Sequence, residues 1–226
     1  MSKKKKSLAQ KINVLRASVM GANDGILSVA GIVLGVAGAT SDNFAIFISG
    51  FAGMLAGTVS MAMGEYVSVN TQKDSQRMAI QKEKKLLKNN YQQEFDFVKQ
   101  NYLKTGMKKE LAEKATTEMM GKDALATTVR ERFSFDINKI TSPYAAAIAS
   151  MISFPTGSLL PLASILLFPE QYRVISTFIS VVIALSITGY VAAKLGNANK
   201  IKSLFRNVVA GIITMIITYL IGTIIS

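Results

Sequence analysis

Two acidic residues lie in sequence that is otherwise suited to lipid: Asp24 within the first long apolar stretch, and Glu65 at the end of the second. A carboxylate in the hydrocarbon of a bilayer costs about 2.5 kcal/mol or more, so it is retained where it faces a partner, a cavity or an ion. Asp24 is the only acidic residue within the five apolar stretches, and Glu65 follows the second stretch by two residues. The chemistry they indicate is the binding or movement of a cation across a membrane.

The residues around Asp24 read Gly21-Ala-Asn-Asp-Gly25. Asn23 and Asp24 offer hard oxygen ligands, and the flanking glycines predict a distorted helix with freed backbone carbonyls. Asn and Asp are also good N-caps, in which case the helix begins after Gly25. An ion site and a capping turn are both open interpretations of this segment.

Met61 and Glu65 are four residues apart and share a helix face. A thioether beside a carboxylate suits Fe²⁺ or Mn²⁺ better than Mg²⁺ or Ca²⁺, which prefer oxygen ligands alone. A structural interpretation is also open, because Met fills gaps in apolar cores and Glu65 has Lys73 and Arg16 as alternative ion-pair partners.

Apolar residues make up half of the 226 residues, and the mean hydropathy is +0.31. A helix needs about 20 apolar residues to cross the roughly 30 Å hydrocarbon core of a bilayer. The segments of this kind are Ser18–Ala39, Phe44–Met63, Pro143–Phe168, Val174–Ala193 and Leu204–Ile225. The sequence therefore predicts an all-α polytopic membrane protein with five transmembrane helices and a cytoplasmic helical domain inserted between the second and third.

The net charge of +12 is compatible with nucleic-acid binding, but its distribution indicates a membrane. With the N-terminus in the cytoplasm, 25 of the 26 Lys and Arg fall in cytoplasmic segments and only Arg173 falls outside. Positive residues favour the cytoplasmic side of short loops. We therefore expect a multi-pass protein of the cell (cytoplasmic) membrane, with its N-terminus cytoplasmic, its C-terminus outside and no nucleic-acid partner.

The chain contains no Cys and no His. Disulfides, thiolate metal sites and cysteine catalysis are therefore excluded, together with the commonest metal ligand and proton shuttle. There is also no Gly-rich phosphate loop and no Ser-His-Asp triad. We expect a protein that is not an enzyme and binds no permanent cofactor, and whose metal ligands are oxygen or Met sulfur.

Four segments follow from these patterns: a basic cytoplasmic N-terminal segment (1–17), transmembrane helices one and two (18–64), a cytoplasmic helical domain (65–140) and transmembrane helices three to five (141–226). A cleaved signal peptide with Lys3–Lys6 as its basic region is the competing interpretation of the first span, but Asp24 interrupts its apolar run. The third span carries Pro155 and Pro161, which predict a kink or a break.

The cytoplasmic domain is predicted to be helical and not a flexible linker. From Glu65 to about Asn101 the chain contains neither Pro nor Gly, so the second helix is expected to continue as a long rod until Gly106 breaks it. Two amphipathic helices then follow, Lys108–Met120 and Lys122–Phe133, separated by Gly121.

Acidic residues in this domain form a second candidate cation site. Glu110 and Glu113 share a helix face, with Glu118 and Glu131 nearby in sequence. Clustered carboxylates attract divalent cations. Lysines are interspersed among these acids, however, and the pattern favours a solvated, salt-bridged surface.

Two motifs in the first two spans together resemble the signatures of the vacuolar iron transporter family: Gly21-Ala-Asn-Asp-Gly-Ile-Leu-Ser28 and Ser60-Met-Ala-Met-Gly-Glu-Tyr-Val-Ser68. Ser153-Phe154 and Pro161-Leu162 resemble the family's third span, and Thr218-Tyr-Leu-Ile-Gly222 resembles its fifth. The resemblance covers nearly the whole membrane part, and the chain looks like a bacterial-type member.

The resemblance implies a homodimer with five spans per chain and a translocation path between the two first spans. Members of that family move cytosolic Fe²⁺, and in some cases Mn²⁺, out of the cytoplasm in exchange for protons. By motif matching, Asp24 is an ion ligand of span one, and Met61 and Glu65 are ligands of span two. The physical interpretation agrees, because dimer symmetry brings these carboxylates toward one axis, where they can exchange a proton for a cation.

The cytoplasmic domain departs from the family, whose members carry many Glu there. Polar or basic residues stand where acids are expected: Gln76, Gln81, Lys84, Lys85 and Gln92. Thr127 and Thr128 precede Glu131 in place of Met or His. The acids that still match are Glu83, Glu110, Glu113, Glu118 and Glu131. The resemblance therefore implies a retained fold and leaves open whether this domain binds metal.

Two further functions fit the same sequence. One is a non-transporting membrane scaffold or metal-sensing protein whose cytoplasmic helices bind a partner. The other is transport of a different solute, such as a small organic cation. Iron and manganese accept the same oxygen and thioether ligands, so the residues do not favour either metal.

Overall fold

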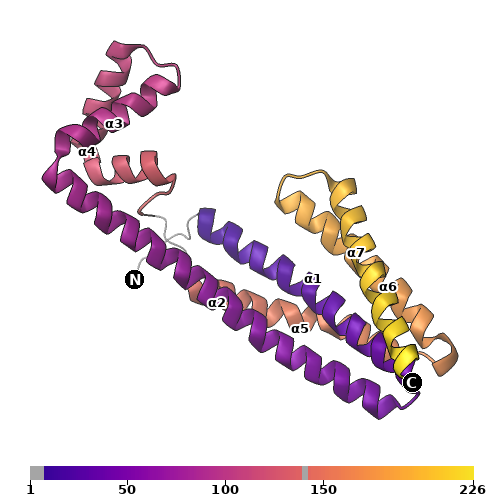
Figure 1. Ribbon diagram of the computed structural model, residues 1–226. Helices are drawn as coiled ribbons and strands as arrows, with labels where there is room; N and C mark the ends of the chain where they lie inside the picture. The colour runs from indigo at the N-terminus through magenta and orange to yellow at the C-terminus, as the bar shows by residue number, and fades with distance from the viewer. Residues whose placement is uncertain (1–7, 139–141) are drawn as a thin grey trace, which may run out of the picture. The chain divides into compact units, whose positions relative to one another are not determined.

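The fold is all-helical. The structure, a computed structural model, describes residues 8–138 and 142–226, and within these ranges the chain forms seven α-helices and no strand. In chain order they are α1 (Leu8–Ala39), α2 (Asn43–Asn89), α3 (Tyr91–Lys104), α4 (Lys109–Phe133), α5 (Pro143–Leu167), α6 (Glu170–Leu195) and α7 (Lys200–Ile225) (Figure 1). In the described residues, five helices are long and apolar enough to cross a membrane, namely α1, α2, α5, α6 and α7. The predicted helical class is confirmed and the predicted spans coincide with these helices, while residues 1–7 of the predicted N-terminal segment lie outside the described residues.

The described chain divides into two compact units. The span unit comprises residues 11–68 and 142–226 and holds the five apolar helices, including the first half of α2. The other unit, which we call the intervening unit, comprises residues 8–10 at the start of α1 and residues 69–138, which form the polar second half of α2 together with α3 and α4. A small core of Val98, Tyr102, Ala112 and Met120 packs α3 against α4. The amphipathic faces of these two helices therefore form a core of their own.

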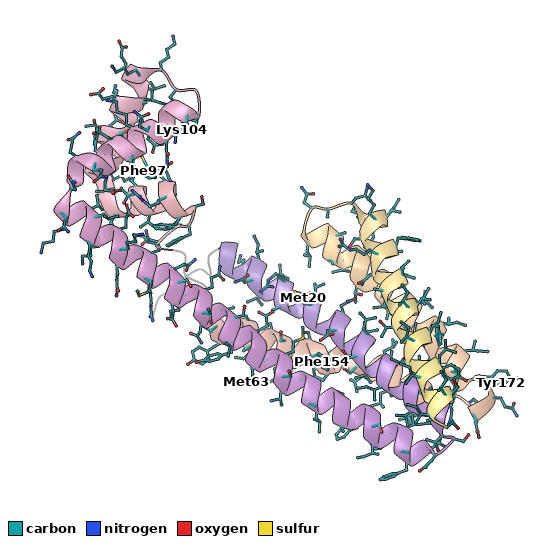
Figure 2. The ribbon with its side chains drawn as sticks, viewed as in Figure 1. Met20, Met63, Phe97, Lys104, Phe154 and Tyr172 are labelled. Carbon is teal, nitrogen blue, oxygen red and sulfur yellow. The ribbon has the colours of Figure 1, made fainter. Side chains whose placement is uncertain are left out.

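Small residues let α1 approach α5 closely. A methyl group on Gly25 would overlap the carbonyl oxygen of Phe154, and one on Gly157 would overlap the carbonyl oxygen of Ala22. Ser158 Oγ donates to the carbonyl oxygen of Gly25 (3.2 Å). Figure 2 shows the Phe154 side chain between α1 and α2, where it packs on the bare backbone of Gly57. Such close contacts are typical of helices that pack in lipid.

The same principle joins α1 to α7, since a methyl group on Gly222 would overlap the carbonyl oxygen of Gly35. Helices α6 and α7 run side by side (Figure 1). The apolar core between the spans includes Val29, Val33, Leu34, Met54, Ile165, Val181, Leu185 and Met215. The outward faces carry exposed apolar side chains, among them Val59, Ile179, Ile187, Ile213 and Ile224. Exposed apolar faces on helices of this length are suited to contact with lipid.

The prediction that the second helix continues to about Asn101 is wrong, because α2 ends at Asn89. Asn90 leaves the helical conformation (φ −153°, ψ 62°), and its side chain donates to Gln93 Oε1 (3.1 Å). Asn favours such breaks because its side chain forms local hydrogen bonds. The break lets Val98 of α3 reach the core that it shares with α4.

The end of α3 is predicted correctly, because Gly106 follows it with a φ of +91°, a conformation that suits glycine. The two helices predicted next are the two halves of α4, which meet at a kink at Asp123 (φ −160°, ψ 93°), two residues after the predicted boundary at Gly121. Asp123 Oδ1 accepts from the backbone N–H of Ala126 (2.8 Å) and caps the second half of α4. The capping carboxylate therefore sets the position of the kink.

Helix α5 continues through Pro155 and Pro161, so the predicted break is not found. Each proline leaves the carbonyl four residues earlier without its helical donor. The freed carbonyls are those of Met151 and Gly157. The nearby hydroxyl groups donate to other carbonyls, Thr156 Oγ1 to that of Ile152 (2.7 Å) and Ser158 Oγ to that of Phe154 (2.9 Å).

Candidate functional site

One exposed face of α1 carries polar and sulfur-containing residues at intervals of four. Arg16, Met20, Asp24 and Ser28 are all exposed in the single chain, and we call them the α1 polar stripe (Met20 is labelled in Figure 2). Ser28 Oγ donates to Asp24 Oδ1 (3.1 Å), and Arg16 Nη1 donates to Met20 Sδ (3.5 Å). Residues four apart lie above one another on a helix, so a guanidinium, a thioether, a carboxylate and a hydroxyl share one side of a candidate span.

The capping-turn interpretation of this segment is wrong, because α1 is helical from Leu8 to Ala39 and passes through Asp24 without a break. The flanking glycines serve packing. A methyl group on Gly21 would overlap Ser153 Oγ, and Gly25 lies against the backbone of α5. Close approach of α5, and not a turn, accounts for the two glycines.

Asn23 points away from the stripe and links α1 to α6 and α7. Its Oδ1 accepts from Thr188 Oγ1 (3.0 Å) and from Asn207 Nδ2 (2.6 Å). Asn207 Nδ2 also donates to the carbonyl oxygen of Leu185 (3.2 Å). Successive residues of a helix are about 100° apart. Asn23 and Asp24, predicted as adjacent ligands, therefore face different surroundings.

Glu65 is buried, with 8% of its surface exposed, and forms an ion pair with Arg16 (Oε2 to Nη2, 3.3 Å). The pairing with Arg16 that the sequence allowed is therefore present, and it connects α2 to the stripe of α1. Met61 lies one turn before Glu65 and is partly buried. The thioether and the carboxylate of α2 thus share a face, as their spacing predicts.

Met20 is absent from the predicted set of ligands, although its spacing of four residues from Asp24 is visible in the sequence. Met in an apolar helix usually fills gaps in a core. Met20 instead is 46% exposed on the face of Asp24. A second thioether is therefore available beside the carboxylate of α1.

In the intervening unit, Glu83 of α2, Glu94 of α3 and Arg132 of α4 meet around one guanidinium. Glu83 Oε2 lies 3.2 Å from Arg132 Nε, and Arg132 Nη2 donates to Glu94 Oε2. The guanidinium carbon lies 4.0 Å from the centre of the Phe97 ring. We call these four residues the Arg132 cluster.

Glu83 has the most perturbed acid–base chemistry of the cluster. Burial raises the pKa of the Glu83 carboxyl to about 7, the neighbouring Glu94 adds to the rise, and Arg132 opposes it. Among the described residues, neither carboxylate oxygen of Glu83 has a well-aligned hydrogen bond. A buried carboxylate beside a second one is costly to ionise. Glu83 therefore holds its proton more tightly than a carboxyl group in water does.

Glu131, another predicted ligand, binds different partners. Tyr102 Oη donates to Glu131 Oε1 (3.4 Å), and Arg130 pairs with the same atom (3.3 Å). Burial, together with the charge of Glu131, raises the pKa of the Tyr102 hydroxyl. Glu131 is thus occupied at the edge of the small core and is not part of the Arg132 cluster.

The remaining predicted acids lie on the surface of α4. Glu110, Glu113 and Glu118 are exposed. Glu113 forms an ion pair with Lys99 (2.8 Å), and its hydrogen bond with Lys99 lowers the pKa of the Glu113 carboxyl. The contact of Glu113 fits the salt-bridged surface that the interspersed lysines favour.

A single chain offers no closed metal cage: in the part of the chain that the structure describes, no group of three or more acidic residues is placed to hold a metal ion. Two of the predicted ligands are associated with the α1 polar stripe. Asp24 belongs to the stripe, and Glu65 forms an ion pair with Arg16 of the stripe. Glu83 lies in the Arg132 cluster instead. The stripe is the candidate cation site.

Comparison with known proteins places the chain in a family. The model of the VIT family matches residues 15–223. A vacuolar iron transporter of Acanthamoeba castellanii is 34% identical over 209 residues, which cover 92% of this chain and 77% of that protein. Vacuolar iron transporter homolog 2 of Arabidopsis thaliana is 31% identical over 206 residues (91% and 81%), and vacuolar iron transporter homolog 2 of Oryza sativa subsp. japonica is 33% identical over 206 residues (91% and 87%). Together with the five apolar helices, these similarities identify a multi-pass membrane protein, and the chain belongs to the VIT family.

Proposed function

We propose that the protein transports Fe²⁺, Mn²⁺ or both out of the cytoplasm in exchange for protons. The observation that carries the proposal is Asp24, an exposed carboxylate near the middle of a helix that is apolar enough to span a membrane. An ionisable residue at such a position is retained for a function. The relatives named vacuolar iron transporters support iron as a cargo.

We assign Asp24, Met61 and Glu65 as cargo ligands. Carboxylate oxygen and thioether sulfur together suit Fe²⁺ and Mn²⁺ better than Mg²⁺ or Ca²⁺. Met20 adds a second thioether one turn from Asp24. Asn23 is assigned to helix packing, because its Oδ1 is occupied by donors from α6 and α7.

A second copy of the chain completes the proposed site. In one chain the α1 polar stripe is exposed, although α1 has the length and composition of a membrane span. Polar groups that face hydrocarbon are costly. A two-fold related copy packed on this face covers the stripe and brings a second Asp24 opposite the first. This arrangement is our reason for proposing a homodimer.

Crowded carboxylates supply the proposed proton coupling. Like charges close together favour protonation of one of them. A divalent cation that enters the site replaces the proton as the compensating charge, and a proton that returns releases the cation. Exchange of this kind needs no cofactor.

The proposed orientation follows from charge. With the N-terminus and the intervening unit in the cytoplasm, 25 of the 26 Lys and Arg are cytoplasmic. The C-terminus is then outside, and the protein lies in the cell membrane. Cargo therefore enters from the side that carries the intervening unit.

Purified protein in liposomes with an acidic interior tests the proposed function. We expect Fe²⁺ or Mn²⁺ to accumulate inside, and uptake to stop when a protonophore collapses the pH difference, with empty liposomes as the control. Competition by Co²⁺, Zn²⁺ and small organic cations separates metal transport from transport of another solute. A folded, inserted protein that moves no ion, and whose intervening unit captures a specific partner, favours the scaffold or sensor function.

A further inference from the structure

Two buried carboxylates in a small core need a compensating positive charge. Glu83 is fully buried, and Glu94 is 3% exposed. Burial of a charge is costly unless it is paired, and here two like charges are buried together. A proton, a divalent metal ion or a cationic side chain can supply the compensation. Which of these is present decides whether the intervening unit binds metal.

Arg132 has the geometry to compensate both acids. Its planar guanidinium approaches one carboxylate through Nε and the other through Nη2, and a planar fork is suited to bridging carboxylates. Stacking on the Phe97 ring holds the guanidinium in place. The Arg132 side chain is 30% exposed while the two acids are almost fully covered, so Arg132 is the member of the cluster that meets solvent.

A divalent ion held by both acids would lie beside Glu83 Oε2 and Glu94 Oε2, the oxygen atoms that Arg132 already approaches. Such ions take about six ligands, most of them oxygens. Within the described residues no third acid joins Glu83 and Glu94, and Glu131 pairs with Arg130 instead. The fixed positive charge of the guanidinium also repels a second cation at this distance.

We infer that Arg132 is the fixed cation of the buried acid pair and closes the intervening unit to divalent metal ions. The unit folds around an internal ion pair in place of a bound metal, and it does not gather cargo in its core. Replacement of Arg132 while Glu83 and Glu94 are kept should convert the two acids into a cation-binding site. This inference does not depend on the proposed transport function.

Hydrogen–deuterium exchange of the full-length protein in detergent tests the inference, read at the amides of residues 83–98 and 124–133 with and without Mn²⁺. In the wild type we expect no change on addition of Mn²⁺. In Arg132→Met, these amides should exchange faster without metal and slow again with Mn²⁺. The slowing should be about tenfold at ten times the dissociation constant, because stabilisation grows as RT ln(1 + [L]/Kd).

Arg130→Met is the matched control, because Arg130 is an exposed neighbour that pairs with Glu131 outside the cluster. It should behave as the wild type does. Protection of the wild-type amides by Mn²⁺ would overturn the inference. An Arg132→Met variant that stays folded and whose amide exchange does not change with Mn²⁺ would also overturn it. The same holds for an Arg132→Met variant that unfolds and does not refold when Mn²⁺ is added.

Discussion

Asn23 and Asp24 are adjacent in the chain but serve different purposes. Asn23 accepts hydrogen bonds from Thr188 and Asn207, and this fixes the rotation of α1 against α6 and α7. The fixed rotation leaves Asp24 on the exposed face, where Ser28 donates to it. A polar anchor on one side of the helix therefore determines where the neighbouring carboxylate lies.

The ion pair between Arg16 and Glu65 predicts competition with cargo. If Glu65 is a ligand, an incoming metal ion must displace the guanidinium of Arg16. Arg16→Gln should lower the metal concentration that gives half-maximal uptake by about fivefold, since a partly exposed ion pair contributes about 1 kcal/mol. Lys11→Gln, an exposed change on the same helix, is the control. An unchanged or higher half-saturating concentration would count against the role of Glu65.

The types and spacing of Asp24, Met61 and Glu65 were sufficient to predict them as candidates, because a carboxylate in apolar sequence is conspicuous. The choice of Arg16 over Lys73 as the partner of Glu65 was not predictable, since it depends on how α1 and α2 cross. The environment of Asn23 depends on residues more than 160 positions later in the chain, which no local pattern reveals.

At the scale of elements, the glycine positions indicate which helices are in close backbone contact. The side of α1 at Gly25 meets the backbone of α5, whereas Gly31 makes only ordinary contacts with α7. Gly25→Ala should destabilise the span unit by about 1–3 kcal/mol, because a methyl group there forces the helices apart. Gly31→Ala, the same change six residues later, should be neutral or slightly stabilising. Thermal unfolding in detergent compares the two, and equal effects would contradict the packing described.

The raised pKa of Glu83 predicts a pH-dependent stability of the intervening unit. The folded pKa is about 7 and the reference value is 4.5, so the contribution of Glu83 is fully present below pH 4.5 and is lost as the pH rises through about 7. Glu83→Gln cannot titrate. Its unfolding free energy relative to the wild type should therefore rise between pH 5 and pH 8, by on the order of 1–3 kcal/mol.

Hydrogen–deuterium exchange of the intervening unit at the two pH values gives this comparison. Gln81→Ala is the control, because Gln81 is exposed on the same helix and carries no titratable group. Its difference from the wild type should be the same at both pH values. A pH-independent difference for Glu83→Gln would show that Glu83 does not change its protonation on unfolding in this range.

Element types were predictable from sequence because length and apolar composition decide them, but the end of α2 and the position of the kink in α4 were not. Asn90 breaks the predicted rod and Asp123 displaces the predicted kink from Gly121. At both positions the side chain forms a local hydrogen bond that competes with the regular helix. The break predicted in α5 is absent, since the helix continues from Pro143 to Leu167 through both Pro155 and Pro161.

At the scale of the whole molecule, the Arg132 cluster and Asp24 are two acidic sites in different surroundings. The intervening unit compensates Glu83 and Glu94 with a guanidinium from its own helices. The span unit leaves Asp24 exposed on a face that a single chain does not cover. The first arrangement is complete in one chain, whereas the second needs a further copy and a cation in our proposal.

The most direct measurement compares uptake of Fe²⁺ and Mn²⁺ by the wild type, Asp24→Asn and Asp42→Asn in liposomes with an acidic interior. Asp42 is an exposed acid whose Oδ1 accepts from the backbone N–H of Phe44 (2.9 Å), a bond that Asn can also accept. We expect uptake by Asp24→Asn to fall to that of empty liposomes, while Asp42→Asn retains wild-type uptake. Wild-type accumulation by a folded Asp24→Asn protein would contradict the proposal that the carboxylate of α1 carries the cargo.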